Sequence, residues 1–588
     1  MSKVFSFWRV VILSGRVVIL SGVVVAGSTA FAQEDVVAPS TVSAGDSLLI
    51  KELYLKGIQQ KTSGQLAAAE QTFEKLVLLQ PDNDAAHFEL ARIYFERKDY
   101  VSAEQAAIRA TQFNRDNEWY WSTLLAIYRK TENVKAMPAV FDELMRLHPD
   151  KATYYHDKAY ALYLDKRYEE SLAMYDTISA KFGETADQYL TKHQIYLAQG
   201  DKNAAITQLE LLISEKPKES KGYILLAELY TDIGETKKAI SLLDEATGLF
   251  PGEPLILLGK SDTYLAMDKQ RQAYDFLRQA FESDDLGIDA KAGILYAALA
   301  NRKHPLATKS LTSLADLLAE TYPLETKAHA VKGDIYMQLN QFEQARQAYL
   351  KALDINRYID GIWQQLLQVE LQLGQYDDVE THGKEALALF PNHPLILFFT
   401  GHGFMGNQHY QEARAYLEAS LNNANEEHTP LLTQLYGNLG DVYNTLGMYA
   451  ASDVAYEEAI ALDSTNAYAL NNYAYYLALR KDRLQHAAEM SRRSNEIAPD
   501  YASYQDTYAW ILFQQGEYQY ALEWIEKAIR SSDVVSETLL EHYGDILAKL
   551  GNIEEAIVQW KKARAISQTV GKNIDKLSRK IDAKQYIE

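Results

Sequence analysis

Small, aromatic and helix-ending residues recur along this chain with a period of 34 residues. Two series of mostly small residues keep a constant phase through the first half of the chain: Gly57, Ala91, Leu125, Ala159, His193, Ala227 and Ser261, and Ala69, Ala103, Met137, Ser171, Ala205, Ala239 and Ala273. Two further phases are mostly tyrosine or proline: Tyr94, Tyr128, Leu162, Tyr196, Tyr230 and Tyr264, and Pro81, Pro149, Pro217 and Pro251. A fixed period of this length indicates a repeat architecture.

Each period predicts two helices joined by a turn. The small positions are where the paired helices approach closely, the aromatic position fills the space between neighbouring pairs, and proline ends the second helix because it has no backbone N–H. The clearest copies are "ILLAELYTDIGETKKAISLLDEATGLFP" and "YGNLGDVYNTLGMYAASDVAYEEAIALD". They resemble the tetratricopeptide repeat (TPR), which implies an all-α, right-handed superhelical solenoid of about fifteen helix-turn-helix repeats.

The period also predicts the boundaries between segments. Residues 50–287 hold repeats one to seven, and residues 288–325 form an irregular repeat, about four residues longer, that contains "NRKHP". Residues 326–566 hold repeats nine to fifteen, with a second slip at "NNANEEHTP". The polar tail 567–588 predicts a capping helix, because a solenoid needs a polar cap over its last apolar face.

The start of the chain contains an exact tandem copy, "RVVILSGRVVILSG". Arg9 and Arg16 interrupt the apolar run, which is then shorter than the ~18 to 20 residues that span a bilayer. A basic start, an apolar core and "AFA" before "QED" follow the order of an export signal. We therefore expect a signal peptide at 1–32, a flexible segment at 33–49, and a soluble periplasmic or cell-envelope product without a stable membrane span.

Composition narrows the class of protein further. At 588 residues the chain is too long for one hydrophobic core, and its lack of cysteine excludes disulfides and thiolate metal sites. The net charge is -21, and -24 without residues 1–32, which hold three basic residues and no acidic one. Such an acidic chain is a poor candidate for binding nucleic acid or anionic membranes.

One stretch imitates a nucleotide-binding motif. In "PLILFFTGHGFMG", residues Gly401, Gly403 and Gly406 have GxGxxG spacing after an apolar run. The stretch nevertheless aligns without gaps with the repeat that begins at Leu249, and this alignment puts Gly401 at the small helix-packing position. We therefore assign these glycines to a repeat and expect no cofactor.

The sequence offers no convincing catalytic or metal site. His393, His402 and His409 suggest a metal cluster, but the repeat phase places them before a helix, on its groove side and after it, and there is no HExxH. The chain has no GxSxG or P-loop motif, and its many carboxylates fall on polar helix faces. We expect a protein that is not an enzyme.

The TPR resemblance implies a concave groove lined by the second, fifth, ninth and twelfth residues of each first helix. The aromatic residues at these phases form an N-terminal and a C-terminal group: Tyr54, Phe88, Phe95, Trp119, Tyr160 and Tyr163, and Tyr468, Tyr475, Trp510 and Phe513. Polar residues lie between the groups: Lys221, Glu228, Asp262, Asp334, Gln364 and Gln368. Each group is either an exposed binding patch or part of the core, since an error of one residue turns a groove side chain inward.

These expectations favour a non-enzymatic adaptor or assembly scaffold in the bacterial cell envelope, whose groove aromatics bind segments of one or more partner proteins. The alternative is a carbohydrate-handling scaffold in exopolysaccharide export or cell-wall assembly, where tryptophan and tyrosine stack on sugar faces. A regulatory subunit of an enzyme is a third possibility. Recognition of terminal carboxylates is disfavoured, because Asn471 and Asn472 alone do not make the clamp that some TPR domains use.

Overall fold

The computed structural model describes residues 44–569 and 572–588, in which every regular element is a helix. The expected signal peptide, residues 1–32, and most of the expected flexible segment lie outside the described residues. The chain folds into two compact units, each with more spatial contacts inside it than to the other, and we describe them separately. Unit 1 ends at Gly287 and also includes the loop 301–306, whereas unit 2 contains residues 288–300 and 307–588.

Unit 1 consists of helices that are mostly 13 to 15 residues long. Its helices are α2 (Ala44–Thr62), α3 (Leu66–Leu79), α4 (Asp84–Glu96), α5 (Tyr100–Phe113), α6 (Glu118–Lys130), α7 (Met137–Leu147), α8 (Ala152–Leu164), α9 (Tyr168–Phe182), α10 (Ala186–Gln199), α11 (Lys202–Glu215), α12 (Ser220–Asp232), α13 (Thr236–Leu249), α14 (Pro254–Ala266) and α15 (Gln270–Glu282), with a short 3-10 turn, η1 (Val134–Ala136), before α7.

Unit 2 continues the same alternation and ends with a short unpaired helix. Its helices are α16 (Ile288–Ala300), α17 (Thr308–Thr321), α18 (Thr326–Gln338), α19 (Phe342–Ile355), α20 (Asp360–Leu373), α21 (Tyr376–Leu389), α22 (Pro394–Gly406), α23 (Tyr410–Asn423), η2 (Glu426–His428), α24 (Thr429–Thr445), α25 (Tyr449–Leu462), α26 (Ala467–Arg480), α27 (Leu484–Ile497), α28 (Ala502–Gln515), α29 (Tyr518–Ser531), α30 (Glu537–Lys549), α31 (Ile553–Thr569) and α32 (Asp575–Ala583).

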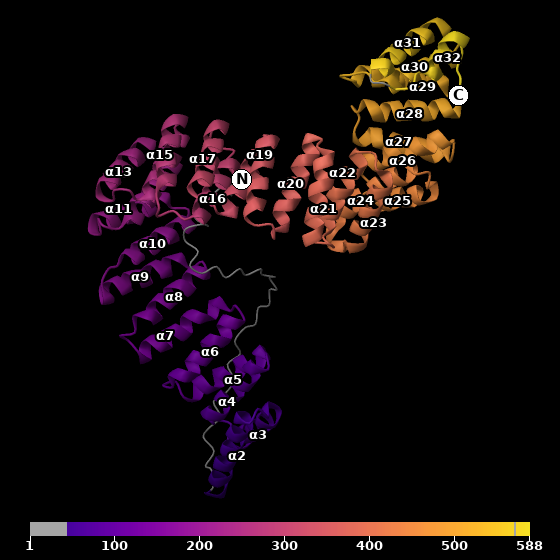
Figure 1. Ribbon diagram of the computed structural model, residues 1–588. Coiled ribbons are helices and arrows are strands. Elements are labelled where there is room, and N and C mark those ends of the chain that lie inside the picture. The colour runs from indigo at the N-terminus through magenta and orange to yellow at the C-terminus, as the bar shows by residue number, and fades with distance from the viewer. Residues whose placement is uncertain (1–43, 570–571) are drawn as a thin grey trace. The chain divides into compact units, whose positions relative to one another are not determined.

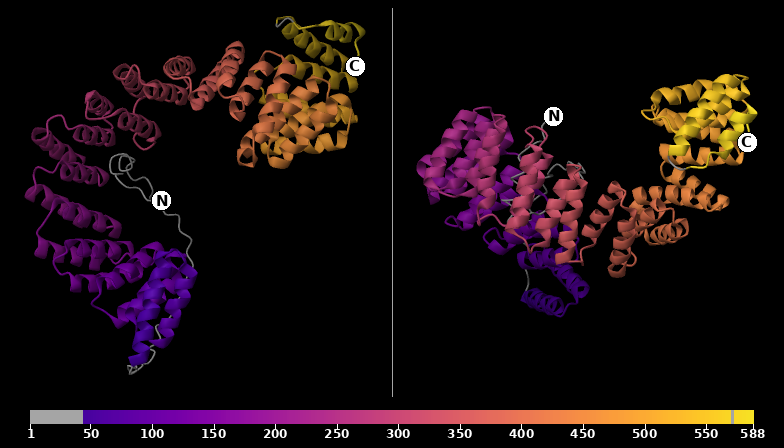
Figure 2. Two further views of the ribbon diagram at one scale, coloured as in Figure 1. Left: turned by 60° about the horizontal axis from the view of Figure 1, so that its bottom comes forward. Right: turned by 45° about the horizontal axis from the view of Figure 1, so that its top comes forward.

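The helices from α2 to α31 form fifteen consecutive pairs within the described residues, the even-numbered helix being the first of each pair. Within each unit, each helix contacts the next one, and several first helices also contact the first helix of the following pair, as in α4 with α6 and α26 with α28. Figures 1 and 2 show the pairs of each unit following one another in chain order. The predicted all-α architecture of about fifteen helix-turn-helix repeats is confirmed.

Except in the α16–α17 pair, the turn inside a pair repeats with the same period as the helices. One residue in the turn has a positive φ, at Gly64, Lys98 and Glu132 in the first three pairs and at Gly200 in the fifth. Glycine adopts this left-handed conformation without a steric penalty, whereas lysine and glutamate adopt it at some cost in free energy. The sequence pattern concealed this period because glycine occupies the position in only some of the repeats.

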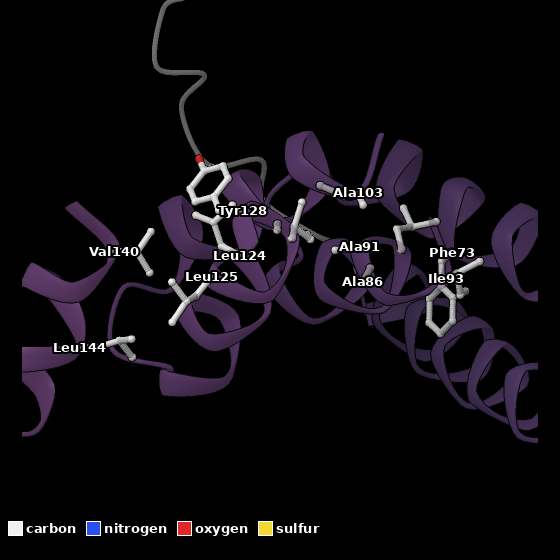
Figure 3. Close-up of a cluster of buried hydrophobic side chains, with 14 of the residues drawn as sticks. Phe73, Ala86, Ala91, Ile93, Ala103, Leu124, Leu125, Tyr128, Val140 and Leu144 are labelled. Carbon is white, nitrogen blue, oxygen red and sulfur yellow. The ribbon is translucent and has the colours of Figure 1, made fainter. Parts of the chain in front are cut away.

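Small side chains lie where the two helices of a pair come closest. The alanines of the second small series are fully buried, among them Ala69, Ala103 and Ala239, and so are Ala91 and Ala227 of the first series. Figure 3 shows Ala86, Ala91 and Ala103 packed among larger apolar residues of unit 1. The predicted role of the small positions in helix packing is therefore confirmed.

The tyrosines of the aromatic phase lie between neighbouring pairs. The Tyr94 hydroxyl in α4 donates to Glu74 of the preceding helix α3, with an oxygen-oxygen distance of 2.9 Å. Tyr230 donates in the same way to Glu210 at 2.7 Å, again twenty residues earlier in the chain. The ring fills the space between the pairs while the hydroxyl reaches a carboxylate at the rim. This arrangement accounts for some of the 40 tyrosines in the chain.

Enlarging a fully buried small residue tests this packing. Ala345 of α19 has no exposed surface, so Ala345→Leu should lower the free energy of unfolding by about 1 to 3 kcal/mol, because the added carbons overpack a helix-helix contact. The control, Gln347→Leu, places the same side chain at an exposed position of the same helix and should change it by less than about 0.5 kcal/mol. Urea denaturation curves measure both, and equal effects would mean that the repeat phase is wrong.

Two predicted boundaries differ from the observed helices. Helix α2 begins at Ala44, so the last residues of the segment 33–49 that was expected to be flexible are helical. The predicted capping helix, 567–588, is shorter than expected, because α31 continues to Thr569 and α32 spans only Asp575–Ala583. The extra residues of the long repeat lie in the loop 301–307 between α16 and α17.

Candidate functional site

The first helices of unit 1 present two strongly exposed aromatic rings at the predicted groove positions. Trp119 of α6 is 72% exposed, and Tyr160 of α8 is 57% exposed. Tyr160 stacks on Tyr163, one turn later on the same helix, with ring centroids 6.3 Å apart. Aromatic rings held by neighbouring side chains offer contact area with little loss of conformational entropy on binding. Unit 1 therefore has rings available to a partner.

The other predicted groove residues of unit 1 are half-buried. They are Tyr54, Phe88, Phe95 and Tyr163. Phe88 packs against Tyr120 of the next pair at 4.8 Å between ring centroids, and the Arg92 guanidinium lies 5.5 Å from the Phe88 centroid. These rings serve partly as packing between pairs, and Trp119 and Tyr160 carry most of the exposed aromatic surface at the predicted positions.

In unit 2 the predicted groove residues divide into exposed and buried ones. Tyr468 of α26 is 42% exposed and Tyr475 is half-buried, whereas Trp510 and Phe513 of α28 are only 8% and 4% exposed. The prediction that Trp510 and Phe513 are available to a partner is therefore wrong.

Residues distant in sequence cause this burial. The Trp510 ring stacks on His542 of the next pair, with centroids 4.0 Å apart. Phe513 packs edge-on against Tyr586, which follows the final helix, at 5.3 Å. Repeat phase describes neighbouring pairs and contains no information about a tail that folds back onto earlier pairs. The sequence pattern therefore gave no signal for the Tyr586 contact.

A pair of carboxylates lies on the first helices of unit 1. Asp262 of α14 and Glu228 of α12 occupy the same repeat position, the ninth, in successive pairs. Burial raises the pKa of Asp262 to about 7, and the negative charge of Glu228 contributes to the shift. The folded protein therefore holds a proton on Asp262 over much of the range in which an ordinary aspartate is ionised.

This shift predicts a pH dependence of stability. The pKa of Asp262 is higher in the folded state than in the unfolded state, so its contribution to stability is full below about pH 4 and is lost as the pH rises towards 7. Asp262→Asn should remove this loss and stabilise unit 1 by about 1 to 3 kcal/mol at pH 8, a range already reduced for the partial exposure of the side chain. Asp275→Asn, at an exposed position of α15, is the control.

Denaturation midpoints measured between pH 4 and pH 8 test this prediction. The curves of the wild type and of Asp262→Asn should separate as the pH rises, and the Asp275→Asn curve should stay parallel to the wild type. Parallel curves for all three proteins would contradict the expected shift.

Sequence reasoning missed a polar cluster around Asp441 of α24. Its carboxylate accepts hydrogen bonds from the hydroxyls of Tyr456, Tyr468 and Tyr476 and from the Asn472 amide. The Tyr476 oxygen lies 3.0 Å from Asp441 Oδ1, and Asn472 Nδ2 lies 3.3 Å from it. The repeat pattern contains no signal for this cluster, because its donors lie 15 to 35 residues from Asp441 in the chain.

The features that suggested a nucleotide or metal site have structural roles. Gly401 and Gly403 lie within helix α22, and a Cβ atom added to them would come within 2.8 Å of Leu417 and 2.7 Å of Val379. The glycines thus permit close helix packing, as the alignment with the Leu249 repeat predicts. Gly406 likewise faces Tyr376.

The three histidines of this region contact different carboxylates or amides. His393 lies 3.1 Å from Asp360, His402 lies 3.3 Å from Asn438, and His409 lies 2.9 Å from Glu380. His393 directly precedes α22, His402 lies within that helix, and His409 lies in the turn before α23, in the order that the repeat phase predicts. Among the described residues no group of three histidine or carboxylate side chains is arranged to hold a metal ion.

Comparison with known proteins identifies the class of the chain. Family models described as tetratricopeptide repeat match four segments: 62–127, 191–254, 326–358 and 433–466. These segments contain helices of both units, and two of them, 326–358 and 433–466, each match a single helix pair. The chain therefore contains tetratricopeptide repeats in both units. Its repeats make it a protein-interaction scaffold in the general sense, a class that is typically non-catalytic.

Individual relatives are distant. The chain is 22% identical over 318 residues to the TPR repeat-containing protein YpiA of Bacillus subtilis (strain 168). The aligned region covers 53% of this chain and 72% of that protein. It is 23% identical over 202 residues to the BBSome complex member BBS4 homolog of Drosophila melanogaster, covering 32% of this chain and 41% of that protein.

Solved structures that match the chain superimpose on it poorly. The APC/C hetero-tetramer Cut9-Hcn1 contains a chain that matches 85% of this one and 96% of its own length, with 15% identity and a TM-score of 0.36. A tetratricopeptide repeat protein from Parabacteroides merdae ATCC 43184 matches 44% of this chain and 98% of its own, with 16% identity and a TM-score of 0.36.

Proposed function

We propose that this protein is an exported, non-enzymatic adaptor or assembly scaffold of the bacterial cell envelope. In this proposal, exposed aromatic side chains on the first helices hold extended segments of partner proteins. The observation that carries the proposal is the exposure of Trp119 and Tyr160 at groove positions of unit 1. Tryptophan and tyrosine are enriched among the residues that contribute most of the free energy of binding at protein interfaces.

The cellular location in this proposal is supported by the sequence of the first 32 residues, which has the order of an export signal. Among the described residues, no helix combines the length and apolarity needed to cross a bilayer. We expect the protein in the periplasmic fraction, with Gln33 as the first residue of the processed chain. Cell fractionation followed by N-terminal sequencing checks this, and an intact Met1 start in the cytoplasmic fraction would contradict it.

Site-specific photo-crosslinking in the native envelope tests the binding function. Photoreactive residues at Trp119 and Tyr160 probe the groove, and one at the exposed Lys237 of α13, a second helix of its pair, is the control. Capture of one discrete protein from the groove positions alone would support the adaptor. Adducts that do not differ between groove and control positions would contradict it.

A carbohydrate-handling scaffold is the second candidate function. The observation that favours it is again Trp119, because a ring 72% exposed also offers a flat face for stacking on a sugar. Glycan adducts in the same crosslinking experiment would favour this function over the protein adaptor. The genes that neighbour this one provide a further criterion, since secretion genes favour the adaptor and glycosyltransferase genes favour the carbohydrate scaffold. The acidic composition of the chain disfavours nucleic acid as a partner of either.

A further inference from the structure

Three repeats of unit 2 contain the same three-residue device. Each of the other described pairs lacks at least one of its three residues. A glycine-aspartate pair stands in the first helix, and an aromatic residue follows fifteen positions after the aspartate, in the second helix. The three sets are Gly333, Asp334 and Tyr349; Gly440, Asp441 and Tyr456; and Gly544, Asp545 and Trp560. In each set the aromatic side chain donates a hydrogen bond to the aspartate, with Tyr349 and Trp560 at 2.8 and 2.9 Å.

The glycines allow this contact because a side chain at their position would collide with the ring. A Cβ atom built on Gly333 would lie 2.4 Å from Tyr349, and one on Gly544 would lie 2.5 Å from Trp560. The three aromatic residues are themselves almost fully buried. Each aspartate therefore accepts a hydrogen bond from a buried side chain that has little freedom to move. The aspartate is at the ninth position of its repeat, which the TPR arrangement places on the groove side.

The third copy of the device holds a lysine. The Lys580 ammonium of α32 lies 2.8 and 2.7 Å from the two carboxylate oxygens of Asp545, and 2.6 Å from Glu541. Lys580 has no exposed surface. Because α32 follows the last pair, this lysine enters from the side on which a further repeat would pack. The device thus accepts a cationic side chain that comes from outside the pair.

The second copy holds only neutral groups. The donors to Asp441 besides Tyr456 are Tyr468, Asn472 and Tyr476 of the following first helix, α26. No lysine or arginine among the described residues forms an ion pair with Asp441. Hydroxyl and amide donors stabilise a carboxylate without neutralising it, so a cation placed there gains a charge-assisted hydrogen bond.

The surroundings of Asp441 suit an organic cation. Tyr468, which covers one carboxylate oxygen, is 42% exposed and therefore able to move aside. Tyr475 and Tyr476 lie next to each other on α26, with ring centroids 6.0 Å apart. Tyr501, 61% exposed, stacks on Tyr504 in the adjoining pair. Tyrosine faces attract lysine ammonium and arginine guanidinium groups through cation-π interactions.

We propose that Asp441 is the receptor for a lysine or arginine side chain of an extended partner segment. The cation displaces the Tyr468 hydroxyl from Asp441 and lies against the tyrosine rings of α26, in the way that Lys580 binds the equivalent Asp545. The partner segment is basic and complements the net charge of -21 on this chain. The proposal rests on the proposed function, namely that the groove binds protein segments, and adds the chemistry of one contact.

Peptide selection on the full-length protein tests the proposal. A random peptide library is selected on the wild type and depleted on Asp441→Asn, so that the recovered peptides are those whose binding depends on the Asp441 carboxylate. We expect a lysine or arginine at one fixed position of the recovered peptides. Recovered peptides without a fixed cation would overturn the proposal, and so would a selection that yields no peptide dependent on Asp441.

Affinities in solution then locate the contact. One selected peptide and its counterpart with norleucine in place of the lysine are titrated by fluorescence anisotropy against the wild type, Asp441→Asn and a control, Asp354→Asn, at an exposed position of α19. The norleucine peptide and the Asp441→Asn variant should each weaken binding about tenfold. The two changes together should weaken it no further, because they remove the same interaction. Asp354→Asn should bind as the wild type does. Fully additive losses would contradict a direct contact.

Tyr468→Phe keeps the proposal testable if Asp441→Asn proves poorly folded. Removal of the Tyr468 hydroxyl frees one oxygen of Asp441, so the lysine peptide should bind several-fold more tightly to this variant. Unchanged or weaker binding would overturn the displacement of Tyr468. The crosslinking test of the proposed function uses Trp119 and Tyr160 of unit 1, so failure of the Asp441 contact and failure of the scaffold function give separate results.

Discussion

Replacement of Lys580 by methionine should destabilise the C-terminal pairs by about 3 to 5 kcal/mol. Lys580 is fully buried, and its ammonium binds Asp545, whose side chain is only 2% exposed, and Glu541. Without the ammonium, the buried Asp545 carboxylate loses its ion-pair partner, and most of the penalty of its desolvation is no longer offset. Because each repeat contacts only its neighbours, the loss should be confined to helices close to α30 and α32.

Hydrogen exchange resolved by helix, together with chemical denaturation, measures this loss. Lys576→Met is the matched control, because Lys576 is on the same helix, is 56% exposed at its side chain and lies 3.9 Å from Glu541. It should change stability by less than about 0.5 kcal/mol. The double variant Lys580→Met, Asp545→Asn should recover much of the loss, since neither buried charge remains. Equal effects of Lys580→Met and Lys576→Met would contradict the role assigned to the buried ion pair.

The pH dependence of the Lys580→Met variant has a definite sign. Burial raises the pKa of Asp545, whereas Lys580 lowers it, so removal of the lysine raises this pKa further. The variant should therefore lose stability as the pH rises and regain part of it as the pH falls and Asp545 is protonated. A loss that is constant from pH 4 to pH 8 would instead attribute the effect to packing of the lysine stem.

Phe141→Ala is expected to have an effect of similar size in unit 1. Phe141 of α7 is 1% exposed and packs with Val140 and Leu144 in the largest apolar cluster of that unit. Truncation removes most of a buried ring and leaves a cavity, which costs about 3 to 5 kcal/mol at such sites. Figure 3 shows Val140 and Leu144 of the same helix directed into the cluster.

Phe113→Ala is the matched control, because it removes the same side chain from the second helix of the preceding pair. Phe113 is 42% exposed and packs on His87 at 5.5 Å between ring centroids. We expect its truncation to cost less than about 1 kcal/mol. Denaturation curves of both variants show whether the loss of stability depends on the burial of the phenylalanine or only on the removal of a phenyl ring. Similar losses from the two truncations would mean that Phe141 is less tightly packed than its exposure indicates.

The candidate site was predictable only in part, and the reason differs between residues. The exposure of Trp119 and Tyr160 was predictable, because the repeat period defines the helix phase and the helix phase directs these two rings away from the core. Trp510 was assigned to the C-terminal group by the same argument, but His542 of the next pair covers its ring. Helix phase gives the direction of a side chain and does not give the identity of the side chain that meets it.

The sequence by itself determined the repeat: its length, the helix pair, and the small residues, such as Ala239, at the closest contacts. These follow from local rules, because helix phase and turn geometry depend on residues near one another in the chain. Only the tertiary structure decided which groove residues are free and which carboxylates are paired. Asp545 and Lys580 are 35 residues apart, and Phe513 meets Tyr586, because the tail folds back over the last pairs. Contacts of this kind depend on non-periodic residues, for which the repeat pattern provides no information.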